Sequence, residues 1–236
     1  MSGHASQCAT WTAEQWLGRL QESYPAVGSL FANLMRHAVL GSVAAEVARA
    51  FAAIASSLET GGTLYLCGNG GSFSDALHIS GELLKSFVLP RPLPAELRRH
   101  LEAHPNGGEL AEHLQAGLRA HVLGCNAALL SAVANDIPVE GIGYAQELCA
   151  LARSGDTLLG ISTSGRARNV LLAVSTAKAI GLTTIGLTGQ GQNPLSTLVD
   201  IPLCVPDTET YRVQELHLAL YHQLCLMLEA RFFGSS

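Results

Sequence analysis

The sequence predicts an α/β protein: a three-layer sandwich in which helices cover both faces of a five-stranded, mainly parallel sheet. Short apolar runs alternate with longer helical patterns from residue 63 onwards, as in parallel sheets with crossover helices. Two of these runs end in turns rich in glycine or hydroxyl side chains that lead into helices. With 48% hydrophobic and 14% charged residues, the chain of 236 residues suits a single domain with a large core.

Composition and charge disfavour several classes of protein. A net charge of −5 without a basic block argues against a surface that binds nucleic acid. The chain has no signal-peptide pattern and no run near eighteen apolar residues, so we expect a cytoplasmic protein that does not bind membranes. The cysteines lack CxxC spacing and suit reduced, packed thiols; they are Cys8, Cys67, Cys125, Cys149, Cys204 and Cys225.

Residues 10–60 form the first expected unit, an apolar and alanine-rich helical segment. Its helical spacing is carried by Trp11, Trp16, Leu17 and Leu20, and then by Leu30, Leu34, Val39, Leu40, Val43, Val47, Phe51 and Ile54. These helices precede every strand on which they could pack. We therefore favour a subunit interface for them over ordinary packing in the core.

A strand is expected at Thr63–Cys67, followed by a turn at residues 68–71 and a helix over Phe73–Phe87. Ser72 stands where its hydroxyl could cap this helix. A glycine turn before a helix presents unpaired N–H groups and the positive end of the helix dipole, which suits a phosphate. The same turn without any ligand is common in α/β folds and is the alternative.

His78 and Glu82 stand four residues apart on this helix, so both side chains lie on one face. An imidazole and a carboxylate would then point into the space above the glycine turn. The alternative is an ordinary surface pair, because such pairs are common on helices and stabilise them by only about 0.2 to 0.5 kcal/mol.

Residues 88–116 have the pattern of an inserted segment in which prolines separate two short helices, near Ala95–Ala103 and Glu109–Ala116. Basic side chains on this segment could contact an anion, but a solvated face is the favoured interpretation; they are Arg98, Arg99, His100 and His104.

The next elements continue the alternation. We expect a second strand at Leu118–Leu123, helices at Ala127–Ala134 and Gly143–Arg153, and a turn at residues 135–138 between these helices. A third strand is expected at Thr157–Ile161.

A second candidate phosphate site follows the third strand. Ser162, Thr163 and Ser164 precede a glycine at the start of a helix over residues 167–180, and Arg166 adds a charged donor. Hydroxyl and N–H donors in such a turn can surround a phosphoryl group. A hydroxyl-rich helix cap without a ligand is the alternative.

The last elements are strands at Thr183–Leu187 and Ile201–Val205, with a glycine turn at residues 188–191 between them, and a helix over Thr208–Phe232. Because ligands of parallel sheets bind beyond the carboxyl ends of the strands, we expect both candidate turns to lie there.

The last helix carries more polar groups than a core helix needs. Gln214, His217 and Tyr221 share one stripe, and His222 lies about 80° around the helix from Gln214. Geometry alone leaves open which of the two histidines belongs to the site.

Five ordered blocks resemble the sugar isomerase (SIS) domain family: CGNGGSFSDALHISGEL, AVANDIP, GDTLLGISTSGRARNV, TIGLTGQ and YRVQELHLALYHQLCLMLE. The resemblance covers about residues 60–232 and is greatest to members that isomerise sedoheptulose 7-phosphate. It implies a parallel sheet flanked by helices, and a homotetramer formed through the N-terminal helices with active sites between subunits. It implies no nucleotide or organic cofactor.

The resemblance also implies roles for individual residues. Glu82 and His222 would be the acid and base that convert the ketose phosphate to D-glycero-D-manno-heptose 7-phosphate through an enediol. Zinc would be bound by His78, Glu82, Gln214 and His222. The substrate would contact Asn69, Gly70, Gly71, Ser72, Asn135, Asp136, Ser162, Thr163, Ser164, Arg166 and Gln214.

The sequence departs from the family pattern at three positions and in one segment. In the usual STSGNS block, Arg166 replaces asparagine and Ala167 replaces serine, and Tyr211 stands where aspartate is common. The segment 88–116 is absent from compact members. The alternatives are a non-catalytic SIS protein that binds a replication initiator or senses sugar phosphates, and an isomerase of another sugar phosphate. Glu82 and His222 favour an enzyme, because such binders typically lack them.

Overall fold

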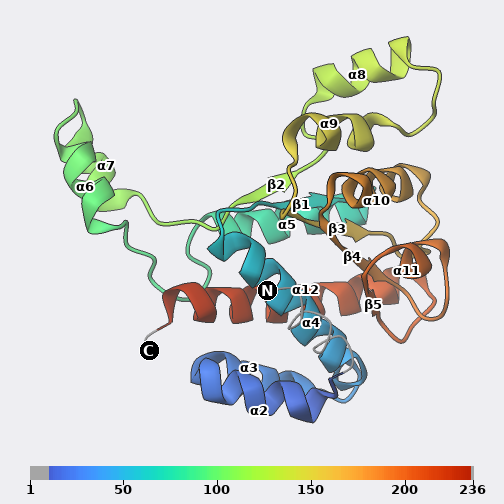
Figure 1. The fold of residues 1–236 in the computed structure, drawn as a ribbon, viewed down its shortest axis with the longest axis horizontal. Coiled ribbons are helices and arrows are strands. Elements are labelled where there is room, and N and C mark those ends of the chain that lie inside the picture. Colours follow the sequence, from blue (N-terminus) through green and yellow to red (C-terminus); the bar gives the residue numbers. More distant parts are fainter. Residues whose placement is uncertain (1–10, 235–236) are drawn as a thin grey trace.

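The computed structural model describes residues 11–234 of the chain (Figure 1). The strands are β1 (Leu64–Cys67), β2 (Ala120–Val122), β3 (Thr157–Ile161), β4 (Thr183–Thr188) and β5 (Ile201–Cys204). The helices are α2 (Ala13–Ser23), α3 (Pro25–Met35), η2 (Leu40–Val43), α4 (Ala44–Glu59), α5 (Gly71–Leu84), α6 (Ala95–Glu102), α7 (Gly107–His113), α8 (Ala127–Asp136), α9 (Gly143–Leu151), α10 (Arg168–Ile180), α11 (Pro194–Leu198) and α12 (Thr210–Phe233).

The strands form one sheet in the order β2-β1-β3-β4-β5, and every neighbouring pair is parallel. The predicted five-stranded parallel sheet is therefore confirmed. The register pairs Leu64 with Thr157 and Cys67 with Gly160, so β1 and β3 run side by side. The strand order reverses between them, and ligands of open parallel sheets bind at such a reversal, beyond the carboxyl ends of the strands.

Alternating side chains on the strands produce the three layers. Leu64 and Leu66 of β1 belong to a core cluster that includes residues of α2, α3, α4, α5 and α12. Tyr65 and Cys67 belong to a second cluster with residues of α9, α10 and α11. Since successive side chains of a strand point to opposite faces, each face of the sheet is covered by its own set of helices (Figure 1).

The N-terminal helices pack on the core of their own chain. α2 begins with a capping box in which Thr12 and Gln15 bond to each other's backbone N–H groups. Most apolar residues expected at a subunit interface are buried in the first core cluster, including Trp16, Leu20, Leu34, Leu40, Val43, Val47, Phe51 and Ile54. Core packing therefore accounts for these side chains, and oligomerisation through the N-terminal helices stays a prediction.

The start of α5 differs from the prediction. The helix begins at Gly71, and the capping position is occupied by Gly70, whose φ of 55° favours glycine. The capping role predicted for Ser72 is therefore wrong, because this residue lies within the first turn of the helix and its side chain is buried.

Several element boundaries also differ from the prediction, and one short helix was not predicted. α5 ends at Leu84 instead of Phe87, because the next residue is extended. α8 continues through Asn135 and Asp136, which the sequence predicted to lie in a turn. The short helix α11 was not predicted, although Asn193 begins it with a capping box and a proline follows directly.

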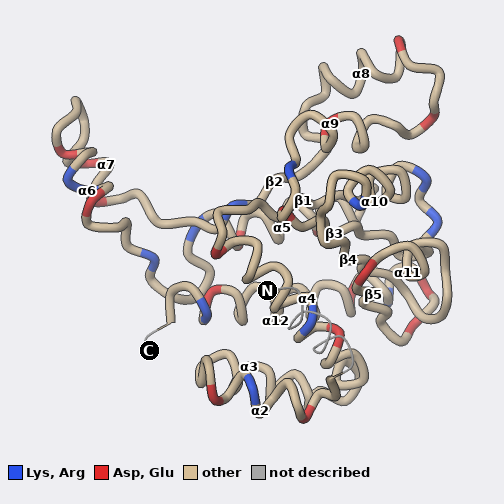
Figure 2. The backbone as a smooth tube through the Cα atoms, viewed as in Figure 1, with Lys and Arg blue, Asp and Glu red and all other residues tan. Residues whose placement is uncertain are grey.

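Two helical segments project from the rest of the molecule in Figure 1. Residues 88–116 form an arm whose helices α6 and α7 lie away from the sheet. Helix α8 lies at another corner, and only Val133 of that helix is buried. Charged residues of both signs are scattered along the described chain without forming a basic block (Figure 2).

Residues 11–234 contain no helix that is both long and apolar enough to cross a membrane. Cys8 lies outside the described residues. The described cysteines are unpaired, and they are Cys67, Cys125, Cys149, Cys204 and Cys225.

His217 on α12 is a polar residue at the centre of the core. It is fully buried, and neither ring nitrogen has a hydrogen-bond partner among the described residues. Burial lowers the pKa of His217 to about 4, and the nearby backbone of Thr188 only partly offsets this effect. The imidazole is therefore uncharged at neutral pH.

We expect His217 to make the free energy of unfolding fall as the pH decreases from about 6.5 to about 4. In this window the unfolded chain binds a proton that the folded chain does not, because the ordinary pKa of 6.5 is lowered on folding. The loss across the window is roughly 3 kcal/mol. In urea unfolding between pH 4 and 7, His217→Leu should flatten this slope, whereas His104→Leu on the exposed arm should retain it. An unchanged slope in His217→Leu would contradict the expectation.

Candidate active site

Two turns lie side by side at the carboxyl edge of the sheet, as predicted. β1 leads into residues 68–71 and β3 into residues 162–165, on either side of the reversal in strand order. Asn69 of the first turn and Asn169 of α10 exchange two side-chain hydrogen bonds of 2.8 Å. This pair of amides fixes the two turns relative to each other.

The first turn is shaped by glycine and by the approach of α12. A methyl group at Gly71 would collide with the amide nitrogen of Gln214. Ser72 follows with only 4% of its surface exposed. The turn thus brings a serine and an amide to the N-terminus of a 14-residue helix, where N–H groups and the helix dipole favour an anion.

The second turn combines buried and exposed donors. Ser162 is buried and Thr163 is half-buried, whereas Ser164 and Arg166 are exposed. The backbone N–H of Arg166 donates to Oγ of Ser164 at 3.3 Å. α11 supports the turn with a backbone hydrogen bond of 3.0 Å to the carbonyl of Gly165. The exposed part of the turn can therefore meet a ligand while its other side is held in place.

Three potential metal ligands converge from two helices. On α5, Nε2 of His78 lies 3.1 Å from Oε1 of Glu82, and it lies 3.5 Å from Nε2 of His222 on α12. One ligand atom of each residue lies within 4.8 Å of the other two. Helix geometry left two histidines as candidates, and the resemblance implied His222; the structure places His222 in this cluster and His217 in the core.

Tyr221 and Asp75 lie behind the cluster. The hydroxyl of Tyr221 is 3.0 Å from Nδ1 of His78 and 3.3 Å from Oδ1 of Asp75. The hydroxyl can donate to the carboxylate and accept from Nδ1–H of the imidazole. Nε2 of His78 then directs its lone pair towards Glu82 and His222, which is the orientation a metal ligand needs.

Burial changes the ionisation of these groups. It lowers the pKa of His222, His78 lowers it further, and Glu82 opposes the shift. Burial also raises the pKa of Asp75, against the effects of Tyr221 and His78. Burial and the carboxylate of Asp75 raise the pKa of Tyr221. His222 is therefore uncharged at neutral pH and can bind a metal or accept a proton.

Gln214 lies apart from these ligand atoms. It precedes His222 by eight residues, which is about 12 Å along α12. Its amide lies beside Gly71 at the first turn. Within one chain Gln214 therefore adjoins the candidate phosphate site, and its role as a metal ligand stays a prediction.

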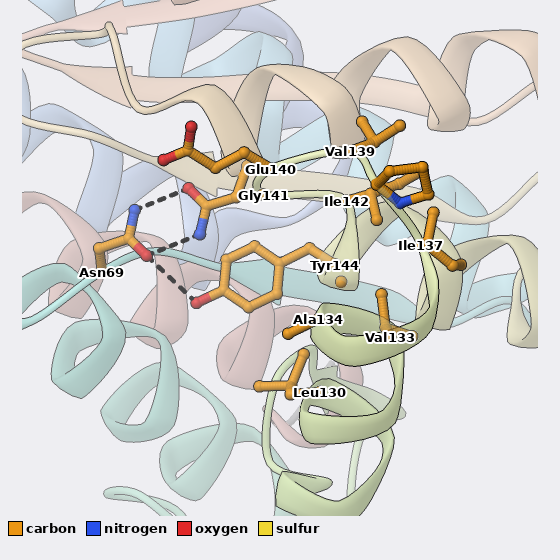
Figure 3. Close-up of a pocket in the computed structure, with 13 residues that line it drawn as sticks. Asn69, Leu130, Val133, Ala134, Ile137, Val139, Glu140, Gly141, Ile142 and Tyr144 are labelled. Carbon is orange, nitrogen blue, oxygen red and sulfur yellow. Dashed lines mark hydrogen bonds between the residues drawn. The ribbon is translucent and has the colours of Figure 1, made fainter.

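A cavity of about 640 Å³ opens beside the first turn (Figure 3). Tyr144 forms one wall, and its hydroxyl donates to the carbonyl of Gly68 at 2.6 Å. Asn69 is part of the lining, and Figure 3 shows Leu130 and Val133 of α8 on the opposite side. The cavity adjoins the first turn but does not include the cluster of histidines and glutamate.

The structure does not bring every predicted residue to the site. Asn135 and Asp136 are exposed at the end of α8, where their side chains form a hydrogen bond of 2.8 Å with each other. Neither lines the cavity beside Asn69. Their contact with a substrate stays a prediction.

Sequence reasoning missed three groups that shape the site. Asp75 lies three residues before His78, so helical spacing could have placed it on the same face. Asn169 follows the second turn, but only the pairing of β1 with β3 brings it to Asn69. Arg91 is fully buried, although its proline-rich surroundings indicated a solvated insertion.

Comparison with known proteins places these features in a family. The chain matches the family described as SIS domain over residues 31–117 and over residues 128–228. It is 38% identical over 183 residues to a phosphoheptose isomerase of Crocosphaera subtropica, covering 78% of this chain and 81% of the relative. A phosphoheptose isomerase of Geotalea daltonii is 36% identical over 200 residues, covering 83% and 91% of the two chains.

Solved structures agree with the sequence comparison. A phosphoheptose isomerase from Francisella tularensis aligns with a TM-score of 0.64 and 28% identity, over 92% of this chain and 98% of that chain. One from Neisseria gonorrhoeae aligns with a TM-score of 0.63 and 25% identity, over 92% and 99%. The SIS-domain matches contain both turns and all three clustered side chains. The chain therefore belongs to the SIS-domain family, and within it to the phosphoheptose isomerases.

Proposed function

We propose that the protein is an aldose–ketose isomerase that converts sedoheptulose 7-phosphate to D-glycero-D-manno-heptose 7-phosphate in the cytoplasm. The observation that carries this proposal is the convergence of His78, Glu82 and His222 in a chain whose relatives are phosphoheptose isomerases. A candidate phosphate site lies at the N-terminal end of the same helix that carries two of these residues. Phosphate binding and proton transfer can therefore act on one substrate.

The donor set fits a zinc ion. Two imidazoles and a carboxylate are common zinc ligands, and tetrahedral ligands at about 2.1 Å from the metal lie roughly 3.4 Å apart. His78 is 3.1 Å from Glu82 and 3.5 Å from His222, which matches this spacing. The amide oxygen of Gln214 is the proposed fourth ligand, which requires this side chain to leave Gly71 and turn along α12 towards His222. When bound, the metal would polarise the substrate oxygens.

The first step is to hold the phosphate end of an open-chain sugar. Ser72, Ser162, Thr163 and Ser164 offer hydroxyl and N–H donors, and the guanidinium of Arg166 adds a charge. Asn69, Gly70, Gly71, Asn135, Asp136 and Gln214 are the further proposed contacts with the substrate. Fixing one end of the chain limits where the reacting carbons can lie, which lowers the entropic cost of reaching the transition state.

The proton transfers belong to Glu82 and His222. Glu82 removes a proton from one of the two adjacent carbons at the carbonyl end of the sugar, C1 or C2, and returns it to the other. His222 transfers the proton between the two oxygens, so the intermediate is an enediol. Only one carboxylate oxygen of Glu82 lies against His78, which leaves the second oxygen for this transfer.

We also propose a homotetramer with active sites between subunits. Exposed apolar side chains lie on the two helices that carry the cluster and just after α5; they are Leu77, Leu84, Val88 and Leu218. A second copy of the chain packed on this face would bury them. It would also shield the cluster from water.

Replacing either proposed proton-transfer residue should strongly slow turnover of sedoheptulose 7-phosphate. We expect Glu82→Gln and His222→Gln to lower kcat about 10² to 10⁴-fold, because each removes one positioned acid or base. The exposed control Glu102→Gln should keep wild-type kcat. In the wild type, turnover in deuterium oxide should place deuterium on C1 or C2, as an enediol requires. Normal activity of Glu82→Gln, or turnover without solvent exchange, would refute the mechanism.

The wild-type assay also separates the alternatives. A folded chain that binds an initiator protein and turns over no sugar phosphate would be a non-catalytic SIS protein. Turnover of a different sugar phosphate in a substrate panel would instead change the proposed substrate.

Truncating the side chains of the second turn that can donate hydrogen bonds should weaken phosphate binding but leave catalysis in place. We expect Ser164→Ala and Arg166→Ala each to raise the KM for the sugar phosphate about tenfold, because each loses a hydrogen bond to a charged group. kcat should change less than threefold. Arg98→Ala on the arm removes another exposed arginine and should leave KM unchanged. An unchanged KM in both turn variants would rule out this phosphate cradle.

The assembly can be measured directly. Light scattering at micromolar concentration should give about four times the chain mass of 24.8 kDa. Leu77→Glu combined with Leu84→Glu should shift the mass towards smaller species, because it places charges on the exposed apolar face. Leu97→Glu on the arm is the matched control. A monomeric mass for the wild type would exclude the tetramer.

A further inference from the structure

A fully buried ion pair joins the two helices of the site. Arg91 follows α5 and Glu229 lies near the end of α12, with Nε of the arginine 2.8 Å from Oε1 of the glutamate. Their side chains are 0% and 1% exposed. Such a pair is tolerated only where further hydrogen bonds satisfy both groups. The partners of each group therefore indicate what the pair holds in place.

Glu229 holds the segment that leaves α5. Its carboxylate accepts backbone N–H donors from Phe87 at 2.9 Å, from Val88 at 2.9 Å and from Leu89 at 3.1 Å. Burial alone would raise the pKa of Glu229, but these bonds and Arg91 outweigh it and lower the pKa. The carboxylate is therefore charged at neutral pH and binds all of these donors.

Arg91 holds the end of α5 itself. Nη1 donates to the carbonyl of Leu83 at 2.8 Å, and Nη2 donates to the carbonyl of Glu82 at 3.0 Å. The last carbonyls of a helix have no partner within it, and a cation there is favoured by the helix dipole. The guanidinium thus fixes the backbone of the residue whose side chain belongs to the metal and proton-transfer cluster.

The same network reaches the histidine of α12. The ring of Phe87, whose N–H is bound by Glu229, lies 5.6 Å from the ring of His222. Glu229 follows His222 by seven residues, which is two helical turns on nearly the same face. A shift of Glu229 relative to α5 would therefore change the separation between His222 and Glu82.

We propose that Arg91 and Glu229 are positioning residues that set the separation of Glu82 and His222 across α5 and α12. Neither residue forms a hydrogen bond with a side chain of the cluster; Arg91 contacts only the backbone carbonyl of Glu82. The catalytic consequence rests on the proposed function, whereas the consequence for metal affinity depends only on the three clustered ligands. Stability is not a sufficient reason for the pair, because apolar residues of similar volume often replace buried ion pairs without loss of stability.

The test replaces the pair while keeping its volume. Arg91→Met with Glu229→Leu should weaken zinc affinity, measured by competition with a chromophoric chelator, by about 10 to 100-fold, as for other residues that orient metal ligands. kcat should fall by a similar factor while the KM for the sugar phosphate stays within twofold, because the phosphate turns lie at the opposite end of α5. The matched control is Arg231→Met with Glu59→Leu, a partly exposed pair of α12 with α4, which should change neither quantity.

A second variant keeps the inference testable if the double variant does not fold. Arg91→Lys keeps a charge beside Glu229, but one ammonium group cannot reproduce the planar fork that reaches both carbonyls. We expect it to weaken zinc affinity several-fold with an unchanged circular dichroism spectrum. Wild-type zinc affinity and kcat in either folded variant would overturn the inference. If the wild type binds zinc but turns over no sugar phosphate, the proposed function fails and zinc competition still decides the inference. A wild-type protein that neither binds zinc nor turns over a sugar phosphate would overturn both the proposed function and this inference.

Discussion

The parallel packing of α5 against α12 is the contact on which the candidate site depends. The two helices meet at three successive levels. Because Gly71 has no side chain, the amide of Gln214 can lie against the start of α5. Two turns further along, Tyr221 bonds to His78 and places the histidine of the next residue beside it. Near the ends of both helices, Glu229 binds the segment after α5. Because all three contacts join α12 to α5 or to the segment directly after it, a change at one level alters the geometry at the others.

In this arrangement the sheet and the helices position different parts of the candidate site. The sheet places the two candidate anion-binding turns next to each other, since β1 and β3 are neighbours at the reversal in strand order. The helices place the proposed acid, base and metal ligands, beginning with His78 about 10 Å along α5 from Gly71. Under the proposed function, a sugar bound by its phosphate at these turns would extend along α5 to reach the cluster. The geometry favours a long open-chain substrate whose carbonyl lies far from its phosphate.

Regular elements of this fold were predictable because their signals are local. The bounds of β3 were predicted at both ends, and the cluster pair His78 and Glu82 followed from helical spacing. The remaining features depend on contacts between distant segments. Ser72 was misplaced because a capping serine and a first-turn serine after glycines look alike in sequence, and the φ of Gly70 decides between them. Helical periodicity could not choose between His222 and His217; the resemblance implied His222, and the structure places it in the cluster.

The arm at residues 88–116 leaves this geometry undisturbed, because its base is closed by hydrogen bonds. Pro92 and Gln115 form an antiparallel bridge, and the carbonyl of Arg91 accepts from the N–H of Ala116 at 2.8 Å. The side chain of Gln115 also accepts from the N–H of Ser86 at 2.9 Å. Hydrogen bonds therefore hold both chain segments of the base, one before α6 and the other after α7. Insertions or deletions in the arm beyond its base need not move α5 or β2. A substitution of Arg91, in contrast, acts on the end of α5 and on the residues that α5 carries.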